Sequence, residues 1–163
     1  DAADAALKVL KSVNIDTNIS QLPKTFLEME RFSYFYKDNV SGMFNEQYLD
    51  FILNKTCQEQ KNGYIDIFLL NNFAQYNKKQ GWSEGSKFLA GFAKYLQHAF
   101  KDSIVFRIHG DDFIVLHNQE TTIEKSFYMQ IEMMQGSGVT IQHSSFSILD
   151  ESICSVKELE DIL

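Results

Sequence analysis

Four turn-forming residues between two short apolar runs are the part of the sequence best suited to chemistry. Residues 109–112, His-Gly-Asp-Asp, separate the apolar residues 104–108 from residues 113–116. This pattern predicts two strands joined by a tight turn, because Gly and Asp accept the positive φ that such turns require. The adjacent carboxylates of Asp111 and Asp112 are oxygen ligands of the kind that Mg²⁺ prefers. Gly and Asp are also ordinary turn residues, so the hairpin taken alone favours a structural role.

The overall composition is that of a folded, acidic domain. The chain has 163 residues, of which 44% are hydrophobic and 23% are charged, and its formal net charge is −7. This length favours one domain with a substantial core. The acidic charge disfavours a general nucleic-acid-binding or anionic membrane surface. No apolar run reaches the roughly 20 residues of a membrane span, so neither nucleic acid nor membrane is an expected partner of this segment.

The two cysteines, Cys57 and Cys154, are isolated in the sequence, with neither CxxC spacing nor a nearby pair of histidines. Their spacing indicates neither a zinc site nor a disulfide framework, and a cytoplasmic location is expected by default. No signal-peptide pattern opens the chain. The start at Asp1, without a methionine, is expected for a segment of a longer protein.

Hydrophobic periodicity predicts a defined order of helices and strands. Helices at residues 1–13 and 23–37 form an N-terminal helical lead over residues 1–37, and residues 38–163 form one further domain. Helices are predicted at residues 45–58, 71–79, 83–100, 121–135 and 155–163, and strands at residues 64–70, 104–108, 113–116 and 139–149. This order predicts an α+β fold with a ferredoxin-like mixed β-sheet flanked by α-helices.

Four segments match, in order, the motifs of one known family. Residues 107–113, Arg-Ile-His-Gly-Asp-Asp-Phe, are similar to an Arg-x-Gly-Gly-(Asp/Glu)-Glu-Phe hairpin. Residues 38–45, Asp-Asn-Val-Ser-Gly-Met-Phe-Asn, are similar to an Asp-x-Leu-Thr-Gly-Leu-x-Asn opening. The other two matches are Asn77, Gly81 and Gly85, after the first strand, and residues 139–141 with 158–159, at the late strand and final helix. Together these segments resemble the GGDEF domains, the family of diguanylate cyclases.

The resemblance implies a palm-like relative of the ferredoxin fold that binds GTP and, as two facing copies, makes cyclic di-GMP. In that family an acid from the first strand and an acid from the hairpin clamp Mg²⁺ on the triphosphate, and an Asn and an Asp read guanine. Carried over by position, Asn77 and Gly110 are candidate nucleotide-binding residues. Asp111 and Asp112 are the candidate metal ligands, and GTP and Mg²⁺ are the implied ligand and cofactor.

The hairpin itself departs from the family motif, so residues 109–113 (His109, Gly110, Asp111, Asp112 and Phe113) form a vestigial version of it. Asp112 is one methylene shorter than the family's Glu. His109 replaces the first Gly and puts a bulky ring where backbone must approach phosphate. No residue is therefore assigned a catalytic role.

Further departures lie outside the hairpin. The family's metal-binding acid on the first strand maps to Leu69, which cannot donate oxygen, and the second acid of that strand maps to Asn71. Ser86 stands in place of the second guanine-reading residue, and Trp82 replaces the usual His. The inhibitory Arg-x-x-Asp of the family is absent, because residues 100–103 are Phe-Lys-Asp-Ser.

Several single residues carry their own expectations. Asp66 is the one acid inside the first predicted strand, but its parity is opposite to that of Leu69, which places its side chain on the other sheet face. Trp82 could stack on a base but is expected in the core. His109 is expected to be solvated. Arg107 is expected to pair with the hairpin acids or a neighbouring domain, while His98 and His143 are interpreted as structural.

The function that follows is a degenerate, catalytically inactive GGDEF domain of a bacterial cyclic di-GMP signalling protein. It would regulate an attached sensor or EAL-type phosphodiesterase module, sensing GTP through Asn77, Asp111 and Asp112. Two alternatives stay open: an active diguanylate cyclase with Asp66 recruited, and an interaction domain that binds no nucleotide. The broad apolar face of the predicted helix at residues 23–37 suits signal transmission or a homodimer. The family's last strand and terminal phosphate-contacting Lys and Arg are expected beyond the end of this sequence.

Overall fold

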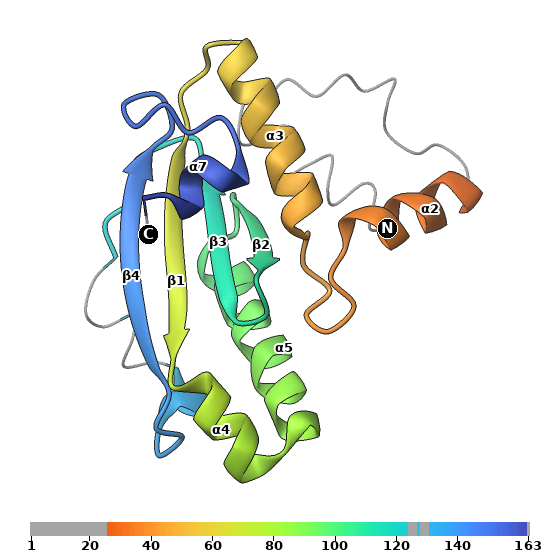
Figure 1. Ribbon diagram of the computed structural model, residues 1–163, viewed down its shortest axis with the longest axis vertical. Helices are drawn as coiled ribbons and strands as arrows, with labels where there is room; N and C mark the ends of the chain where they lie inside the picture. Colours follow the sequence, from red (N-terminus) through yellow and green to blue (C-terminus); the bar gives the residue numbers. More distant parts are fainter. Residues whose placement is uncertain (1–25, 124–126, 128–130, 163) are drawn as a thin grey trace.

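The computed structural model describes residues 26–123, 127 and 131–162. The predicted helix at residues 1–13 and the start of the one at residues 23–37 lie outside this part of the chain. The helices are α2 (Phe26–Tyr36), α3 (Glu46–Gln58), α4 (Phe73–Gln80), α5 (Trp82–Ala99) and α7 (Val156–Glu160), with a 3-10 turn η2 (Glu132–Met134). The strands are β1 (Tyr64–Asn71), β2 (Ile104–Ile108), β3 (Asp112–His117) and β4 (Thr140–Ser147), arranged as Figure 1 shows.

The four strands form one sheet in the order β2-β3-β1-β4, and every pair of neighbours is antiparallel. The α+β, ferredoxin-like class is confirmed, but the expected mixed pairing of strands is wrong. The reason lies in the connection from β1 through α4 and α5 to β2. This connection leaves the position next to β1 empty, and β3 then fills it. β3 therefore lies between β1 and β2 and is antiparallel to both. A single parallel bridge, between Phe44 and Phe106, lies outside the named strands.

Each face of the sheet supports its own hydrophobic core. Ile65 and Ile67 of β1 belong to a buried cluster that includes the inner residues of α3 and α7. Phe68 and Leu70 belong to a second buried cluster, which includes the inner residues of α5. Because alternate residues of a strand point to opposite faces, a sheet covered on both sides shows the nearly continuous apolar run that β1 has. Figure 1 shows α7 lying in front of the strands.

Local sequence explains where the helices around the site begin. Asn45 caps α3, its side-chain oxygen accepting a hydrogen bond from the backbone N–H of Tyr48 at 3.2 Å. Gly81, with φ of 92°, ends α4 and starts α5. A positive φ of this kind favours glycine. The predicted start of this helix at residue 83 is late by one residue, because the turn made by Gly81 starts the helix at Trp82.

The region before β4 differs from the predicted helix at residues 121–135. Residues 121–123 have no regular structure, and the described residues further along form the short turn η2. The rest of that predicted helix, apart from Phe127, lies outside the described residues. No helix formed by the described residues is both long enough and apolar enough to cross a membrane.

Cys57 and Cys154 form a disulfide that joins the end of α3 to the segment before α7. The prediction of two isolated cysteines is therefore wrong. Their Cα atoms lie 5.4 Å apart in space although the residues are 97 positions apart in the chain. No local spacing pattern records such a contact, because the fold alone brings α3 and the loop before α7 together. Disulfides persist mainly in oxidising compartments, whereas the sequence by itself predicts a reducing cytoplasm.

Reduction of this disulfide is expected to destabilise the domain. A cross-link that closes a loop of this length restricts the unfolded chain, and the chain-entropy model values this effect at roughly 4.7 kcal/mol. Urea unfolding with and without dithiothreitol measures the difference. The Cys154→Ser variant is the matched control, since its stability should not respond to the reductant. Two free thiols titrated in unfolded, unreduced protein would contradict the pairing.

Candidate functional site

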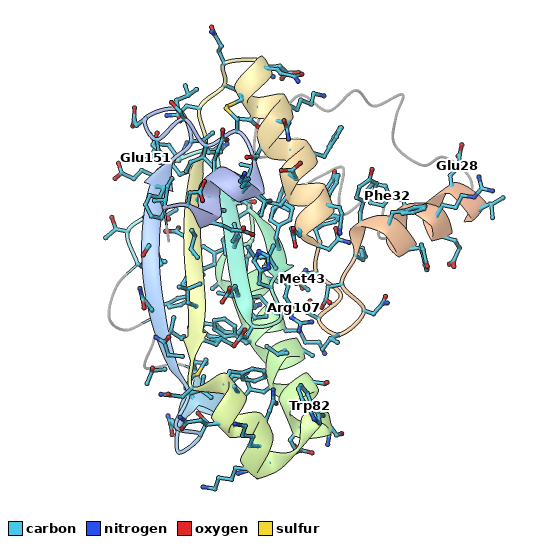
Figure 2. The ribbon with its side chains drawn as sticks, viewed as in Figure 1. Glu28, Phe32, Met43, Trp82, Arg107 and Glu151 are labelled. Atoms are coloured by element: carbon cyan, nitrogen blue, oxygen red, sulfur yellow. A yellow bond between two sulfur atoms is a disulfide. The ribbon has the colours of Figure 1, made fainter. Side chains whose placement is uncertain are left out.

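The side chain of Arg107 joins the hairpin to the turn that precedes α3. Figure 2 labels it close to Met43, which belongs to that turn. Its Nε donates a hydrogen bond to the backbone oxygen of Gly110 at 2.8 Å, and its Nη2 donates to the same oxygen. Its Nη1 lies 2.6 Å from Oδ1 of Asp38. The expectation that Arg107 pairs with the hairpin acids is wrong, since its ion pair is with Asp38; a contact with a neighbouring domain stays a prediction. Its fork of donors instead fixes the tip of the hairpin.

Asp38 is held in its ionised form by the same arrangement. The backbone N–H and the hydroxyl of Ser41 each donate to Asp38 Oδ1 at 2.7 Å. Burial raises the pKa of Asp38, but the hydrogen bonds from Ser41 and from Arg107 outweigh it and lower the pKa below the ordinary value of 3.8. The opening motif and the hairpin motif, 69 residues apart, are therefore one electrostatic unit.

The backbone of the hairpin tip is left-handed at His109, with φ of 45°, and at Gly110, with φ of 84°. The positive φ expected from the sequence is confirmed, although His is an uncommon residue in this conformation. The imidazole of His109 is not simply solvated, because its Nε2 contacts Oε1 of Glu160, the last residue of α7. Only Gly110 and Asp111 of the turn line the main pocket described below.

The two hairpin acids have different surroundings. Asp112 is the cross-strand partner of Leu69 in the antiparallel pair of β1 and β3. Burial and the neighbouring charge of Asp111 raise the pKa of Asp112 to about 6, against a lowering effect of His109. Burial also raises the pKa of Asp111, which Arg107 partly offsets. The carboxylates of Asp111 and Asp112 are thus adjacent. The strand position opposite Asp112 carries the aliphatic side chain of Leu69 and not a third carboxylate.

Asp66 lies on the opposite face of β1, as its parity predicts, and its cross-strand partner is Val115. Its carboxylate lies 2.7 Å from His117 Nε2 and 2.8 Å from His143 Nε2. The hydroxyls of Thr121, at 2.5 Å, and of Ser145 also donate to this carboxylate. The side chain is 2% exposed, and these four groups occupy its oxygens. Asp66 is therefore a buried structural anchor, which confirms the structural interpretation of His143.

A pocket of about 460 Å³ opens between α4, α5 and the tip of the hairpin. It brings together Asn77, Gly110 and Asp111, three of the four residues that the sequence proposes for ligand contact, while Asp112 is not among its lining residues. Phe73 and Leu89 form apolar walls. Trp82 also lines the pocket, and its side chain is 81% exposed, so the expectation of a core tryptophan is wrong.

Asn77 is oriented by the contact between α4 and α5. Its Oδ1 is buried and accepts no hydrogen bond from the residues that the structure describes. A Cβ atom built on Gly85 would lie only 1.7 Å from this oxygen, so the close approach of the two helices requires glycine there. A buried carbonyl without a partner costs about 1–3 kcal/mol.

Arg107 and Asp38 are the functional residues whose roles sequence reasoning missed. Each lies inside a motif that the sequence analysis names, but their pairing depends on the fold. The sequence carries only two signals for this contact. Arg107 lies two positions before the hairpin turn, and Asp38 opens the turn that precedes α3. The structure adds the reason for both residue types, a charge-assisted bond with the side chain of Arg107 only 10% exposed.

Comparison with known proteins places these features in one family. The family model described as "Diguanylate cyclase, GGDEF domain" matches residues 35–148. The GGDEF domain of TpbB (YfiN) from Pseudomonas aeruginosa is 15% identical over 77% of this chain and 83% of its own, with a TM-score of 0.60. A search of curated proteins finds no match.

Two further solved structures share this fold and also contain segments outside the GGDEF domain. The coiled coil and GGDEF domain of DgcB from Caulobacter crescentus, in complex with c-di-GMP, is 14% identical over 90% of this chain and 80% of its own, with a TM-score of 0.61. The S helix-GGDEF-EAL structure of LapD from Vibrio cholerae, bound to c-di-GMP, is 19% identical over 82% of this chain and 37% of its own, with a TM-score of 0.59. At these identities the likeness shows the fold.

Removal of the Asp66 charge is expected to destabilise the domain in a pH-dependent way. Although burial raises its pKa, the hydrogen bonds from the two histidines and two hydroxyls lower it below 3.8 overall. A carboxyl whose pKa falls on folding contributes stability that is complete above its unfolded pKa of about 4 and is lost as the pH falls through its folded pKa. Asp66→Asn should therefore cost roughly 3 kcal/mol at pH 7, with the difference from the wild type narrowing below about pH 4.

Urea unfolding of both proteins from pH 7 down to pH 3 measures this prediction. Asp150→Asn is the matched control, since Asp150 is exposed and lies outside the network. A constant difference in the free energy of unfolding across the whole range would contradict the role given to the charge of Asp66.

Proposed function

The chain belongs to the GGDEF domain family, and we propose that it is a nucleotide-binding but non-cyclising member that regulates another part of its protein. The observation that carries this proposal is the position of Leu69. It is the cross-strand partner of Asp112, at the position where the family has its first-strand metal ligand. The pocket that includes Asn77 is present, but the residue at the first-strand side of the proposed metal clamp, Leu69, is aliphatic.

The pocket suits a purine nucleotide in size and chemistry. Its volume of about 460 Å³ lies within the range of small-molecule sites, roughly 300–1,000 Å³. Phe73 and Leu89 offer apolar walls for a base, and the exposed ring of Trp82 offers a stacking surface. Asn77 supplies the polar group for the edge of the base. GTP is the proposed ligand, with its phosphates directed toward Gly110 at the hairpin.

Mg²⁺ is the proposed cofactor of that binding, in a reduced role. Asp111 and Asp112 supply two adjacent carboxylates whose pKa values are raised by burial and, for Asp112, by mutual repulsion. A divalent cation would relieve that repulsion. Leu69 offers no oxygen, so these residues fit one-sided contact with a nucleotide-bound ion and do not fit a two-sided clamp. Cyclisation needs the clamp and two facing copies, which is why we propose sensing without turnover.

An attached module is the proposed target of regulation. The LapD structure contains an EAL segment after its GGDEF domain, and the DgcB structure contains a coiled coil. In this chain α2 exposes Leu27, Tyr34 and Phe35, with 59%, 79% and 61% of their surface accessible. We propose that residues 1–37 form a signalling lead and residues 38–163 the regulatory domain of a bacterial cyclic di-GMP signalling protein. The α2 face is the proposed contact with a sensor, an EAL-type module or a second copy.

Calorimetric titration with a non-hydrolysable GTP analogue tests the binding step. We expect Mg²⁺-dependent binding that Asn77→Ala weakens about tenfold, the loss of one hydrogen bond to the base. Gln75→Ala, an exposed change on the same helix, should leave affinity unchanged, and an ATP analogue should bind more weakly. Absence of binding with and without Mg²⁺ would reject sensing in favour of an interaction domain that binds no nucleotide. Cyclic di-GMP formed from GTP with Mg²⁺ or Mn²⁺ would instead favour the cyclase alternative.

Restoring the missing carboxylate gives a gain-of-function test. Leu69→Asp puts an oxygen ligand opposite Asp112 and should strengthen Mg²⁺-dependent binding of the analogue by about tenfold, or ~1.4 kcal/mol. Without Mg²⁺ the same variant should be less stable than the wild type, because a third carboxylate joins the pair. Leu69→Asn is the matched control of nearly equal shape without the charge. Equal effects of Asp and Asn on Mg²⁺-dependent affinity would show that Leu69 is not what limits metal binding.

A further inference from the structure

Three ligand-type side chains from distant parts of the chain converge beside the hairpin, on the side of His109. They are Glu46, the first residue of α3, His109 at the hairpin tip, and Glu160, the last residue of α7. One ligand atom from each lies within 4.8 Å of those of the other two. We propose that these three residues form a binding site for a divalent transition-metal ion, with Zn²⁺ as the best match. This site is distinct from the Asp111–Asp112 pair and does not depend on the proposed function.

The elements that carry the three residues are fixed against one another. Asn45 caps α3 and so sets where Glu46 lies. The backbone N–H of Val156, which opens α7, donates to Oδ1 of Asp50 on α3 at 2.9 Å. The disulfide of Cys57 joins the segment before α7 to the end of α3. A site built on two tied helices loses little freedom when an ion binds, which favours affinity.

His109 reaches the site because of its unusual backbone. Its φ of 45° lies in the left-handed region, which most residues other than glycine avoid. This conformation accompanies a ring turned toward α7, where Nε2 contacts Oε1 of Glu160. A glycine at this position would satisfy the turn with less strain but would supply no ligand. The chain therefore has an imidazole side chain at a turn position where the backbone conformation favours glycine.

The charges of the cluster suit a cation better than a simple ion pair. Protonated His109 can balance Glu160, but that leaves the carboxylate of Glu46 close to both. Among the residues that the structure describes, Glu46 has no ion pair of its own. Two carboxylates within 4.8 Å of each other and of an imidazole repel when both are ionised. One divalent ion would neutralise both and accept the lone pair of a neutral imidazole.

The set of donors selects the class of ion. Mg²⁺ and Ca²⁺ prefer oxygen ligands alone, whereas one imidazole nitrogen with two carboxylate oxygens suits Zn²⁺ and its neighbours among the first-row metals. Three protein ligands leave at least one coordination position open. A cavity of about 360 Å³, lined by Glu46 and Glu160 together with Asp50 and Lys157, adjoins the cluster. Water or an anionic ligand would complete the coordination from that side.

Binding of the ion would connect the hairpin to both helices of the α3/α7 face. His109 is next to Gly110, whose backbone oxygen Arg107 holds and which lines the nucleotide pocket. An ion on His109 would therefore fix one side of the hairpin tip while Arg107 fixes the other. The expected consequence is a domain that unfolds at higher temperature when Zn²⁺ is present.

The test uses untagged protein, stripped with chelator and dialysed, with its disulfide intact. Titration with Zn²⁺ alone in a calorimeter should show one equivalent bound, and Co²⁺ should give a visible absorption band of a site with fewer than six ligands. His109→Gly, Glu46→Gln and Glu160→Gln should each weaken binding by more than about tenfold. His109→Gly is the most informative variant, since glycine suits its backbone and should keep the fold intact. His98→Gln, an exposed histidine on α5, should bind like the wild type.

The alternative outcomes separate an ion site from an ion pair. No Zn²⁺ binding to the wild type, or binding that Glu46→Gln and His109→Gly leave unchanged, would overturn the proposal and leave only the His109–Glu160 ion pair. Circular dichroism of each variant before titration shows that a loss of binding does not come from unfolding. The GTP analogue plays no part in the titration, so its result is independent of nucleotide binding.

Discussion

The antiparallel register between β1 and β3 is the constraint on which the chemistry of this domain depends. It pairs Leu69 with Asp112 and Asp66 with Val115. Side chains alternate between faces along a strand, so the three-residue separation of Asp66 and Leu69 puts the only acid of the strand's interior on the wrong face. A shift of one residue would carry every buried side chain of β1 to the opposite core. The two hydrophobic clusters therefore fix the register, and the register separates Asp66 from the hairpin.

The guanidinium of Arg107 connects that sheet to the site. It bonds the backbone of Gly110 and the carboxylate of Asp38 at once, so the tip of the hairpin and the turn before α3 are tied into one unit. The pocket draws one wall from α4 and α5 and the other from this unit. Its shape is therefore set by one charge-assisted network and by the close contact of Asn77 with Gly85, neither of which involves Leu69.

Local patterns predicted most of the fold and part of the site. The hairpin, the strand parity of Asp66 and the order of the elements follow from turn chemistry and periodicity, which act over a few residues. The contacts that sequence reasoning missed join distant segments. The disulfide spans 97 residues, the His109–Glu160 contact 51 and the Arg107–Asp38 bond 69. The exposure of Trp82 was missed for a related reason, since residue type predicts burial only on average and the pocket lies beside its helix.

Binding and turnover are physically separable in this arrangement. The residues proposed to contact a base belong to α4 and α5, whereas the clamp requires an acid at the end of β1. Leu69 offers no oxygen to a metal ion, and it is not among the residues that line the pocket. A ligand that binds only the folded pocket stabilises it by an amount set by its concentration relative to its dissociation constant, about 2.7 kcal/mol at a hundredfold excess. That free energy is comparable to the energies that hold a hairpin or a helix contact in place. A nucleotide can therefore change how this domain presents α2 to a partner only if the pocket and α2 are coupled. The turn of residues 38–45 follows α2 and carries Asp38, the partner of Arg107, so it is the part of the chain that connects the two.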